Sequence, residues 1–391
     1  MLNDFLKYQA KTTPYPLGLE IESAKGSYIF DSQGTKYLDF IAGVSACALG
    51  HSHPKIIEAV KKQVSKYMHV MVYGEFAQEP AVKLCKLIID LLPQNHEVVY
   101  LTNSGTEAIE GAMKLAKRVT GRSELIGAKN SYHGSTHGAL SLLGDENQKM
   151  AYRPLLPGID FIVFNNEKDL EKINESTAAV VLETIQGGAG FILPENDYLK
   201  KVKKRCEEKG ALLILDEIQP GFGRTGKIFG FEHFGISPDI VVLGKALGGG
   251  MPIGAFSAAS TLMKVLEENP KLGHITTFGG NPVIAAAALA NVEEIINSRL
   301  IDDIKSKEEL FREHLQHPKI KQINGTGLML APIFDEEEIP TQLVHRCLKK
   351  GLLLFWLLWE KNAIRISPPL NISDQEIIAG CKIICQTLDE L

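Results

Sequence analysis

Short apolar, β-rich runs alternate with segments of helical periodicity between about residues 54 and 300. Most of these runs are continuously apolar, which is typical of strands whose two faces are both covered by helices. The alternation with helices predicts an α/β fold with a mainly parallel sheet flanked by helices. The runs are EVVYLT, ELIGA, IDFIVF, AAVVLE, ALLILDE and DIVVLG.

Polar residues follow four of these predicted strands. In a parallel sheet, ligands bind beyond the carboxyl ends of the strands. The sequence therefore predicts a site at one edge of the sheet, built from residues that are far apart in the chain. These residues are Asn103-Ser104-Gly105, Glu183, Asp216-Glu217 and Lys245.

The two ends of the chain show different patterns. GSYIFDSQGTKYLDF predicts a hairpin whose turn lies at 31–34. From about residue 300 the pattern is α+β, with strands in GTGLMLAPIF, LLLFWLLW and AIRISPP. A last helix follows Ser373, where Ser373 and Glu376 match a capping box. We predict an N-terminal segment (1–50) that packs with a small α+β domain (296–391), and a large domain (51–295).

Composition excludes several classes of protein. A net charge of −5 over 391 residues and a pI near 6.2 argue against binding to nucleic acid or to anionic membranes. The sequence has no uncharged apolar span of the length that a membrane helix needs, about 18 residues. The six cysteines show no metal-type spacing, so we expect a reducing cytoplasm and no metal site.

Lys245 is awkwardly placed for a surface charge, because it ends an apolar run and opens the glycine-rich stretch ALGGG. Desolvation at the end of a buried strand lowers a lysine pKa and makes the amine a better nucleophile. Gly244 and Gly248 would let backbone or a flat ligand approach closely. The alternative is a lysine that extends to the solvent at the rim of the sheet.

Asp216 precedes a second acid, Glu217, and two such carboxylates at a strand end need partners or solvent. No nearby pair of histidines supports a metal. The other option is the protonated ring nitrogen of a cofactor. An aspartate beside a desolvated lysine suits pyridoxal phosphate, with Lys245 forming the Schiff base. A simple ion pair between Asp216 and Lys245 is the alternative.

The stretch SGTEA follows one strand and opens a helix. Ser104, Gly105 and Thr106 would offer hydroxyl and N–H groups to a phosphate at the helix N-terminus. A plain N-cap with Glu107 in the first turn explains the same pattern. Tyr132, in Tyr132-His133-Gly134, could stack on a flat ring or belong to the core. TTFGGNP at 276–282 is equally ambiguous.

Taken together, these motifs resemble the class III aminotransferases, pyridoxal-phosphate enzymes of fold type I, which implies a mainly parallel seven-stranded-type sheet in the large domain and a smaller α+β domain. The resemblance extends from CALGHSHP at 47–54 to RISPPL at 365–370. Its most specific stretches are LDEIQPGFGRTGKIF and PDIVVLGKALGGGMPIGA. It implies that Lys245 bonds covalently to the cofactor and that Asp216 pairs with the pyridine nitrogen. Gln219 would bind the ring hydroxyl, and Ile218 would pack on one face of the ring.

The resemblance also implies how the rest of the site is built. Tyr132, followed by His133, would stack on the other face of the ring, and Ser104, Gly105 and Thr106 would hold the phosphate. Thr277 would add a phosphate contact from the neighbouring subunit of a homodimer. On the substrate side, Arg365 would pair with a carboxylate, and Glu183 is a further candidate.

By this resemblance, a terminal (ω) amino group passes from an amino acid or diamine, ornithine- or acetylornithine-like, to 2-oxoglutarate. Two positions depart from the usual pattern of that branch. Ser135 stands where an arginine is usual and Gly188 where a glutamate is usual. HGSTHGALSL and RPLLPG also resemble the putrescine-type branch. A diamine or 4-aminobutyrate-type donor therefore stays open, as do an aminomutase or racemase and a non-catalytic scaffold.

Overall fold

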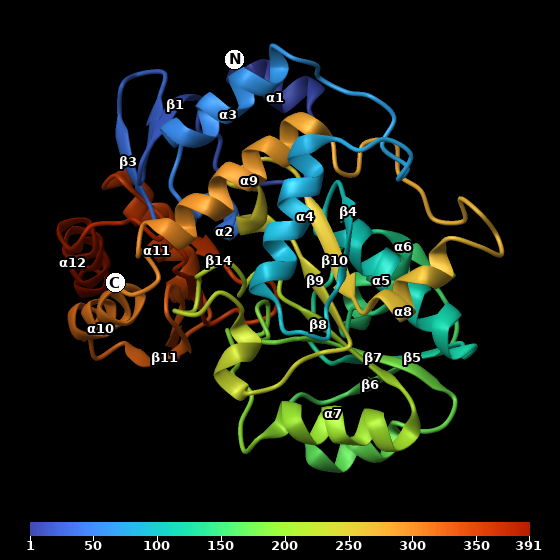
Figure 1. The fold of residues 1–391 in the computed structure, drawn as a ribbon. Coiled ribbons are helices and arrows are strands. Elements are labelled where there is room, and N and C mark those ends of the chain that lie inside the picture. The colour runs from blue at the N-terminus through green and yellow to red at the C-terminus, as the bar shows by residue number, and fades with distance from the viewer.

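The computed structural model describes all residues, Met1–Leu391, and its centre is a seven-stranded sheet (Figure 1). The strand order is β4-β10-β9-β8-β7-β5-β6. The strands are β4 (Val98–Thr102), β5 (Glu124–Ala128), β6 (Ile159–Ile162), β7 (Thr177–Glu183), β8 (Leu212–Asp216), β9 (Ile240–Leu243) and β10 (Gly254–Ala258).

The sheet is mainly parallel, as the apolar runs predicted. Neighbouring strands from β6 to β9 pair in parallel. Strand β10 is antiparallel to both β4 and β9, so β4 still runs in the same direction as the others. The carboxyl ends of six strands therefore meet at one edge.

Helices cover both faces of this sheet, which explains the continuous apolar runs. All seven residues of β7 are buried. Val180 and Leu182 join one apolar cluster with residues of α4, α7 and α9, while Ala179 and Val181 join another with residues of α5 and α6. The helices are α3 (Pro54–Val64), α4 (Glu79–Leu91), α5 (Gly105–Thr120), α6 (His137–Ser141), α7 (Tyr198–Lys209), α8 (Ser260–Met263) and α9 (Pro282–Asn297).

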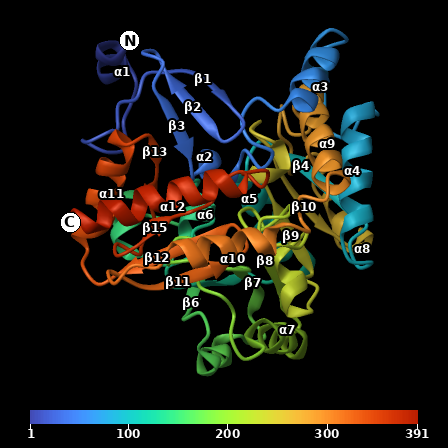
Figure 2. The same cartoon turned by 90° about the vertical axis from the view of Figure 1, so that its left-hand side faces the viewer.

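A second sheet joins the two ends of the chain. Its order is β1-β2-β3-β13, and the hairpin of β2 and β3 confirms the one predicted from the sequence. Strand β13 pairs in parallel with β3. In Figure 2 the N-terminal strands and the C-terminal helices accordingly lie on the same side of the molecule. These strands are β1 (Ile21–Lys25), β2 (Tyr28–Asp31), β3 (Lys36–Asp39) and β13 (Leu352–Leu353).

From about residue 300 onward the chain is α+β, as predicted. Ser373 caps the last helix in a complete capping box with Glu376. The boundaries near residues 50 and 295 stay predictions. None of the helices is long and apolar enough to cross a membrane. The remaining elements are α1 (Leu2–Tyr8), α2 (Ala42–Ser45), α10 (Ile304–His314), β11 (Ile320–Thr326), β12 (Met329–Phe334), α11 (Glu338–Lys349), β14 (Phe355–Trp356), β15 (Ile364–Arg365) and α12 (Asp374–Asp389).

Candidate active site

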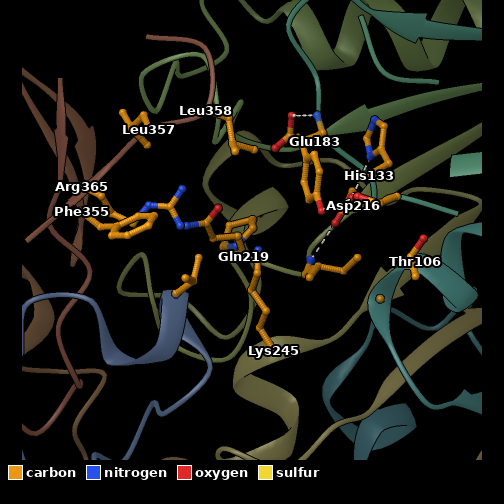
Figure 3. A pocket seen from close by; sticks show the side chains of 18 of the residues that line it. Thr106, His133, Glu183, Asp216, Gln219, Lys245, Phe355, Leu357, Leu358 and Arg365 are labelled. Atoms are coloured by element: carbon orange, nitrogen blue, oxygen red, sulfur yellow. Dashed lines mark hydrogen bonds and ion pairs between the residues drawn. The ribbon is translucent and has the colours of Figure 1, made fainter. Parts of the chain in front are cut away.

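A cavity of about 500 Å³ lies beyond the carboxyl ends of the central strands (Figure 3). One wall comes from the sheet and the loops after its strands, and the opposite wall comes from β14, β15 and the segment between them. Most residues that the sequence selected line this cavity: Gly105, Thr106, Tyr132, His133, Glu183, Asp216, Ile218, Gln219, Lys245 and Arg365.

Lys245 follows β9 after one residue, Gly244, and it lines the cavity. Burial, with a smaller contribution from the nearby guanidinium of Arg365, lowers the pKa of its ammonium group to about 8. The charges of Asp216 and Glu183 act in the opposite direction. Because the lowered pKa leaves a sizeable fraction of the amine neutral near pH 8, Lys245 can act as a nucleophile or as a base.

Asp216 ends β8 at the floor of the cavity and pairs with a histidine. Its Oδ2 lies 2.8 Å from Nδ1 of His133, and its Oδ1 accepts a hydrogen bond of 2.9 Å from the backbone N–H of Ile218. Burial disfavours the imidazolium form of His133, but the hydrogen bond and charge of Asp216 outweigh it and raise the pKa of the imidazole. The carboxylate is therefore held in place by His133 on one side and by the Ile218 backbone on the other.

Glu217 points away from its neighbour and serves the fold. Its carboxylate accepts hydrogen bonds from the Thr184 hydroxyl (2.5 Å) and from the backbone N–H groups of Gly230 (2.7 Å) and Phe231 (2.9 Å). Burial raises the pKa of Glu217 to about 7. The two adjacent acids thus have separate surroundings, and only Asp216 lines the cavity.

The first turn of α5 lies at the cavity through Gly105 and Thr106. The hydroxyl of Ser104 does not line the cavity; it caps the helix by accepting a hydrogen bond of 3.4 Å from the N–H of Glu107. The first N–H groups of a 16-residue helix have no partner within it and attract an anion. A contact between Ser104 and a phosphate stays a prediction.

Glycines shape this part of the wall. A Cβ at Gly105 would lie 2.6 Å from Cδ1 of Ile218, and a Cβ at Gly134 would lie 2.2 Å from Oγ1 of Thr106. Gly134 also has φ of +130°, which side chains rarely allow. The close approach leaves a narrow slot beside Ile218 that suits a flat ring with a phosphate at the α5 N-terminus. Together with Lys245 and Asp216, these residues fit pyridoxal phosphate.

Glu183 ends β7 and binds backbone rather than another side chain. Its two oxygens accept hydrogen bonds from the N–H groups of Tyr132 (3.1 Å) and Gly187 (3.0 Å). Burial raises the pKa of Glu183 to about 7, against the opposing effect of His133. Glu183 therefore fixes the backbone that carries Tyr132. Its contact with a substrate stays a prediction.

Arg365 lies on β15, opposite Phe355 of β14, and is 5% exposed. Its Nε is buried with no hydrogen-bond partner, and burial lowers the pKa of the guanidinium to about 10. The only charge that offsets this burial is that of Glu183, whose oxygens are occupied by backbone N–H groups. A buried guanidinium with an unused donor is a site for a carboxylate.

The wall beside Arg365 is apolar, and no sequence pattern indicated that it would line the site. Phe355 and Leu358 are large apolar side chains that remain 39% and 50% exposed at the cavity. Trp356 and Leu357 lie between them. LLLFWLLW was predicted only as a strand. Its position just before Arg365 in the chain was the one signal that could have placed it in the site.

Both positions that depart from the family pattern lie in the cavity. Ser135 is exposed, and its hydroxyl lies 3.3 Å from that of Tyr132. Gly188 accepts a backbone hydrogen bond of 2.9 Å from Trp359. A Cβ at Gly188 would lie 2.8 Å from Nε1 of Trp359, so the indole takes the space that a side chain would need. Neither position supplies a charge.

Thr277 lies outside the cavity and is exposed. Its neighbour Thr276 accepts a hydrogen bond of 2.7 Å from the Asn103 side chain, which fixes the segment beside the carboxyl end of β4. The phosphate contact across a dimer therefore stays a prediction.

Comparison with known proteins places this chain in a family. Residues 8–388 match the family model described as aminotransferase class III. The chain is 38% identical over 389 residues to the acetylornithine aminotransferase of Caldanaerobacter subterraneus subsp. tengcongensis, with 96% of each chain covered. It is also 38% identical to the putrescine aminotransferase of Pectobacterium atrosepticum, covering 95% of this chain and 83% of the other. The solved ornithine aminotransferase of Toxoplasma gondii ME49 matches with a TM-score of 0.92 at 30% identity, covering 100% of this chain and 95% of that one.

Proposed function

The chain belongs to the class III aminotransferases, which are pyridoxal-phosphate enzymes, and we propose that it transfers a terminal amino group to 2-oxoglutarate. The proposed donor is an ω-amino acid or diamine of the acetylornithine or ornithine type, and the product from the acceptor is glutamate. One observation carries the proposal. A single cavity holds the amine of Lys245, the carboxylate of Asp216 and the unpartnered guanidinium of Arg365.

The sheet wall of the cavity supplies the residues that would hold the cofactor. Lys245 would bind it covalently, and Asp216 would accept a hydrogen bond from the ring nitrogen. Gln219 would contact the ring hydroxyl. Ile218 and Tyr132 would pack on the two ring faces, with His133 behind Asp216 and Ser104, Gly105 and Thr106 around the phosphate. Bound pyridoxal phosphate supplies an aldehyde that joins to amines and a ring that accepts electrons.

Lys245 and Asp216 would divide the proton chemistry between them. The lowered pKa of Lys245 lets its amine take a proton from the reacting carbon of the donor and return it elsewhere. His133 and the backbone N–H of Ile218 both contact the carboxylate of Asp216 and hold it in place. A carboxylate at this position would favour the protonated form of the ring nitrogen that lies opposite it.

Arg365 would bind the carboxylate of the oxo acid, since it is the buried cation of the opposite wall and has a free donor. The positive charge of Arg365 also affects which amino donor the cavity can bind. No acid at Gly188 neutralises it, so a donor that carries a carboxylate matches the cavity better than one whose far end is an ammonium group. This favours an acetylornithine-like or 4-aminobutyrate-like donor. The similarity to a putrescine aminotransferase keeps the diamine as the second candidate.

The homodimer is supported by an exposed apolar surface. Two segments with exposed apolar side chains, 68–76 and 272–278, meet at the rings of His69 and Phe278, which are 4.8 Å apart. A patch of this kind is typical of a protein interface, and Thr277 lies within it. Its exposed apolar members are Met68, Val70, Met71, Tyr73, Phe76, Leu272, Ile275 and Phe278. We also propose a cytoplasmic location, in keeping with six free thiols.

A donor panel tests the function. Purified enzyme is given N-acetylornithine, ornithine, 4-aminobutyrate or putrescine with 2-oxoglutarate, and glutamate is measured, with pyruvate as a control acceptor. We expect glutamate with at least one carboxylate-bearing donor and less with putrescine. Glutamate from putrescine alone would replace the donor assignment by the diamine. Turnover of a donor without any oxo acid would indicate an aminomutase or racemase.

A further inference from the structure

The segment 42–45 contributes Val44 to the cavity lining and has an unusual backbone conformation. Ala42, Gly43, Val44 and Ser45 all have positive φ, between +48° and +67°. Three of the four are not glycine, so this left-handed turn is unfavourable by itself and needs outside support. Val44 lines the cavity from this turn.

Asp39 and His51 provide that support. Oδ1 of Asp39 accepts hydrogen bonds from the backbone N–H groups of Ile41 (2.7 Å) and Ala42 (3.1 Å) at the start of the turn. Oδ2 of Asp39 lies 2.8 Å from Nε2 of His51. His51 is itself fixed, because its backbone exchanges two hydrogen bonds with Gly26, of 2.8 and 3.0 Å.

The pair is buried and charged. Asp39 is 1% exposed, and the side chain of His51 is 14% exposed. The hydrogen bond that His51 donates to Asp39, followed by a contact with Cys47, raises the pKa of the His51 imidazole to about 9. His51 is therefore protonated at neutral pH, and the hydrogen bond between the two groups is of the strong, charge-assisted kind.

Hydrogen bonds connect the 42–45 turn, and the residues just before it, to residues in or near both walls of the cavity. Ser45 accepts a hydrogen bond of 3.4 Å from the side-chain amide of Gln219, which lines the cavity. Before the turn, the carbonyl groups of Phe40 and Ile41 accept hydrogen bonds from the N–H (2.8 Å) and the hydroxyl (3.2 Å) of Ser367. Ser367 is two residues from Arg365. A shift of the turn would therefore displace Gln219 on one wall and the segment around Ser367 near the other.

We propose that Asp39 and His51 are positioning residues, which hold the 42–45 turn so that Val44 and Gln219 keep their places around the bound cofactor and substrate. The proposal rests on the assignment of this cavity as the aminotransferase site. It gives a role in the reaction to two residues that do not touch the cavity. A loss of the pair should loosen substrate binding before it affects cofactor content or the fold.

The chain contains a matched control. Asp31 ends β2 as Asp39 ends β3, and it makes the same kind of local bonds. Oδ1 of Asp31 accepts hydrogen bonds from the N–H groups of Gln33 (2.9 Å) and Thr35 (2.8 Å), and Oδ2 accepts one from the Tyr37 hydroxyl (2.9 Å). None of these residues lines the cavity. Asp31→Asn therefore perturbs an equivalent carboxylate away from the site.

The experiment compares Asp39→Asn, His51→Gln and Asp31→Asn in the cofactor-loaded enzyme, with whichever donor and oxo acid the wild type uses best. Asp39→Asn keeps an oxygen for the two backbone N–H groups but opposes the protonated imidazole with an NH2 group. Steady-state kcat and KM, cofactor content by absorbance and the melting temperature are measured. We expect KM to rise about 10- to 100-fold in Asp39→Asn at full cofactor content. His51→Gln keeps a donor without the charge and should show a smaller rise.

Either of two results would overturn the proposal. The first is a wild-type KM in loaded Asp39→Asn, and the second is an equal rise of KM in Asp31→Asn. Should Asp39→Asn fail to fold, His51→Gln and Val44→Ala decide, since wild-type KM values in both exclude a positioning role. Failure of the wild type to use 2-oxoglutarate counts against the proposed acceptor only, because the comparison runs with any productive pair.

Discussion

The two walls of the cavity differ in how their polar groups are satisfied. On the sheet wall, Asp216 is bound by His133 and the Ile218 backbone, and both oxygens of Glu183 are occupied by backbone N–H groups. On the opposite wall, Arg365 keeps a buried donor without a partner, and Phe355 stays exposed. The first wall is complete without a substrate and suits chemistry that stays the same for every donor. The second wall is incomplete, so it is where substrate binding would be decided.

Loss of the amine on the sheet wall should have the largest effect. Lys245→Ala removes the covalent attachment and the proton carrier together, so we expect kcat to fall at least ~10³-fold. The control is Lys149→Ala, which removes another buried lysine, one that lies outside the cavity. Borohydride reduction of the loaded wild type should mark Lys245 in a peptide map. A cofactor label on any other lysine would contradict the assignment of the covalent attachment to the sheet wall.

The neighbouring acids should separate catalysis from folding. Asp216→Asn removes the anion that faces the cavity, and we expect kcat to fall about 10²-fold with little change in melting temperature. Glu217→Gln changes a carboxylate that binds Thr184, Gly230 and Phe231. That change should lower the melting temperature and leave the kcat of the folded enzyme near wild type. Equal losses of kcat in both variants would show that the sheet wall acts as one structural unit.

A change on the opposite wall should act on binding. Arg365→Lys keeps the charge but loses the bidentate hydrogen bonding of a guanidinium to a carboxylate. KM for the oxo acid should therefore rise roughly 10- to 100-fold, with a smaller change in kcat. Arg122→Lys is the control, since Arg122 binds the carbonyl groups of Thr177 and Lys209 on another part of the sheet. A fall in kcat with an unchanged KM would assign Arg365 to the chemistry.

The pH dependence of cofactor loading should give the smallest effect. Because burial lowers the pKa of Lys245 to about 8, its reactive neutral form declines about tenfold per pH unit below that value. Loading of cofactor-free protein, followed by absorbance, should slow accordingly between pH 8 and pH 6. The folded pKa lies below the ordinary value of 10.5. The cost of burying the charge is therefore fully present below pH 8 and is relieved as the pH rises. A loading midpoint near 10.5 would contradict the burial of Lys245.

The sequence predicted the sheet wall well because local patterns define it. Continuous apolar runs gave the strands, and Glu183, Asp216 and Lys245 were found by their places at strand ends. Strand β10 was missed, because its sequence, GAFSA, consists largely of small residues with low β propensity. The different surroundings of Asp216 and Glu217 depend on loops far along the chain, and no local pattern contains them.

The opposite wall was harder to predict, because tertiary contacts create it. LLLFWLLW is not one strand but two strands of two residues each, followed by a segment that Trp359 anchors to Gly188. The 42–45 turn has three non-glycine residues with positive φ, which no turn signature indicates. Arg365 was found only because it lies in a family motif. Its lack of a partner became clear from the structure.

The parallel pairing of β3 with β13 sets the order in which the enzyme can mature on the ribosome. Leu353 must reach Asp39 before that small sheet exists, and the two are more than three hundred residues apart. The strands that end at Asp216 and just before Lys245 emerge much earlier, so the sheet wall of the cavity can form during synthesis. The wall that contains Arg365 can form only when translation is nearly over, because β14 and β15 lie close to the C-terminus.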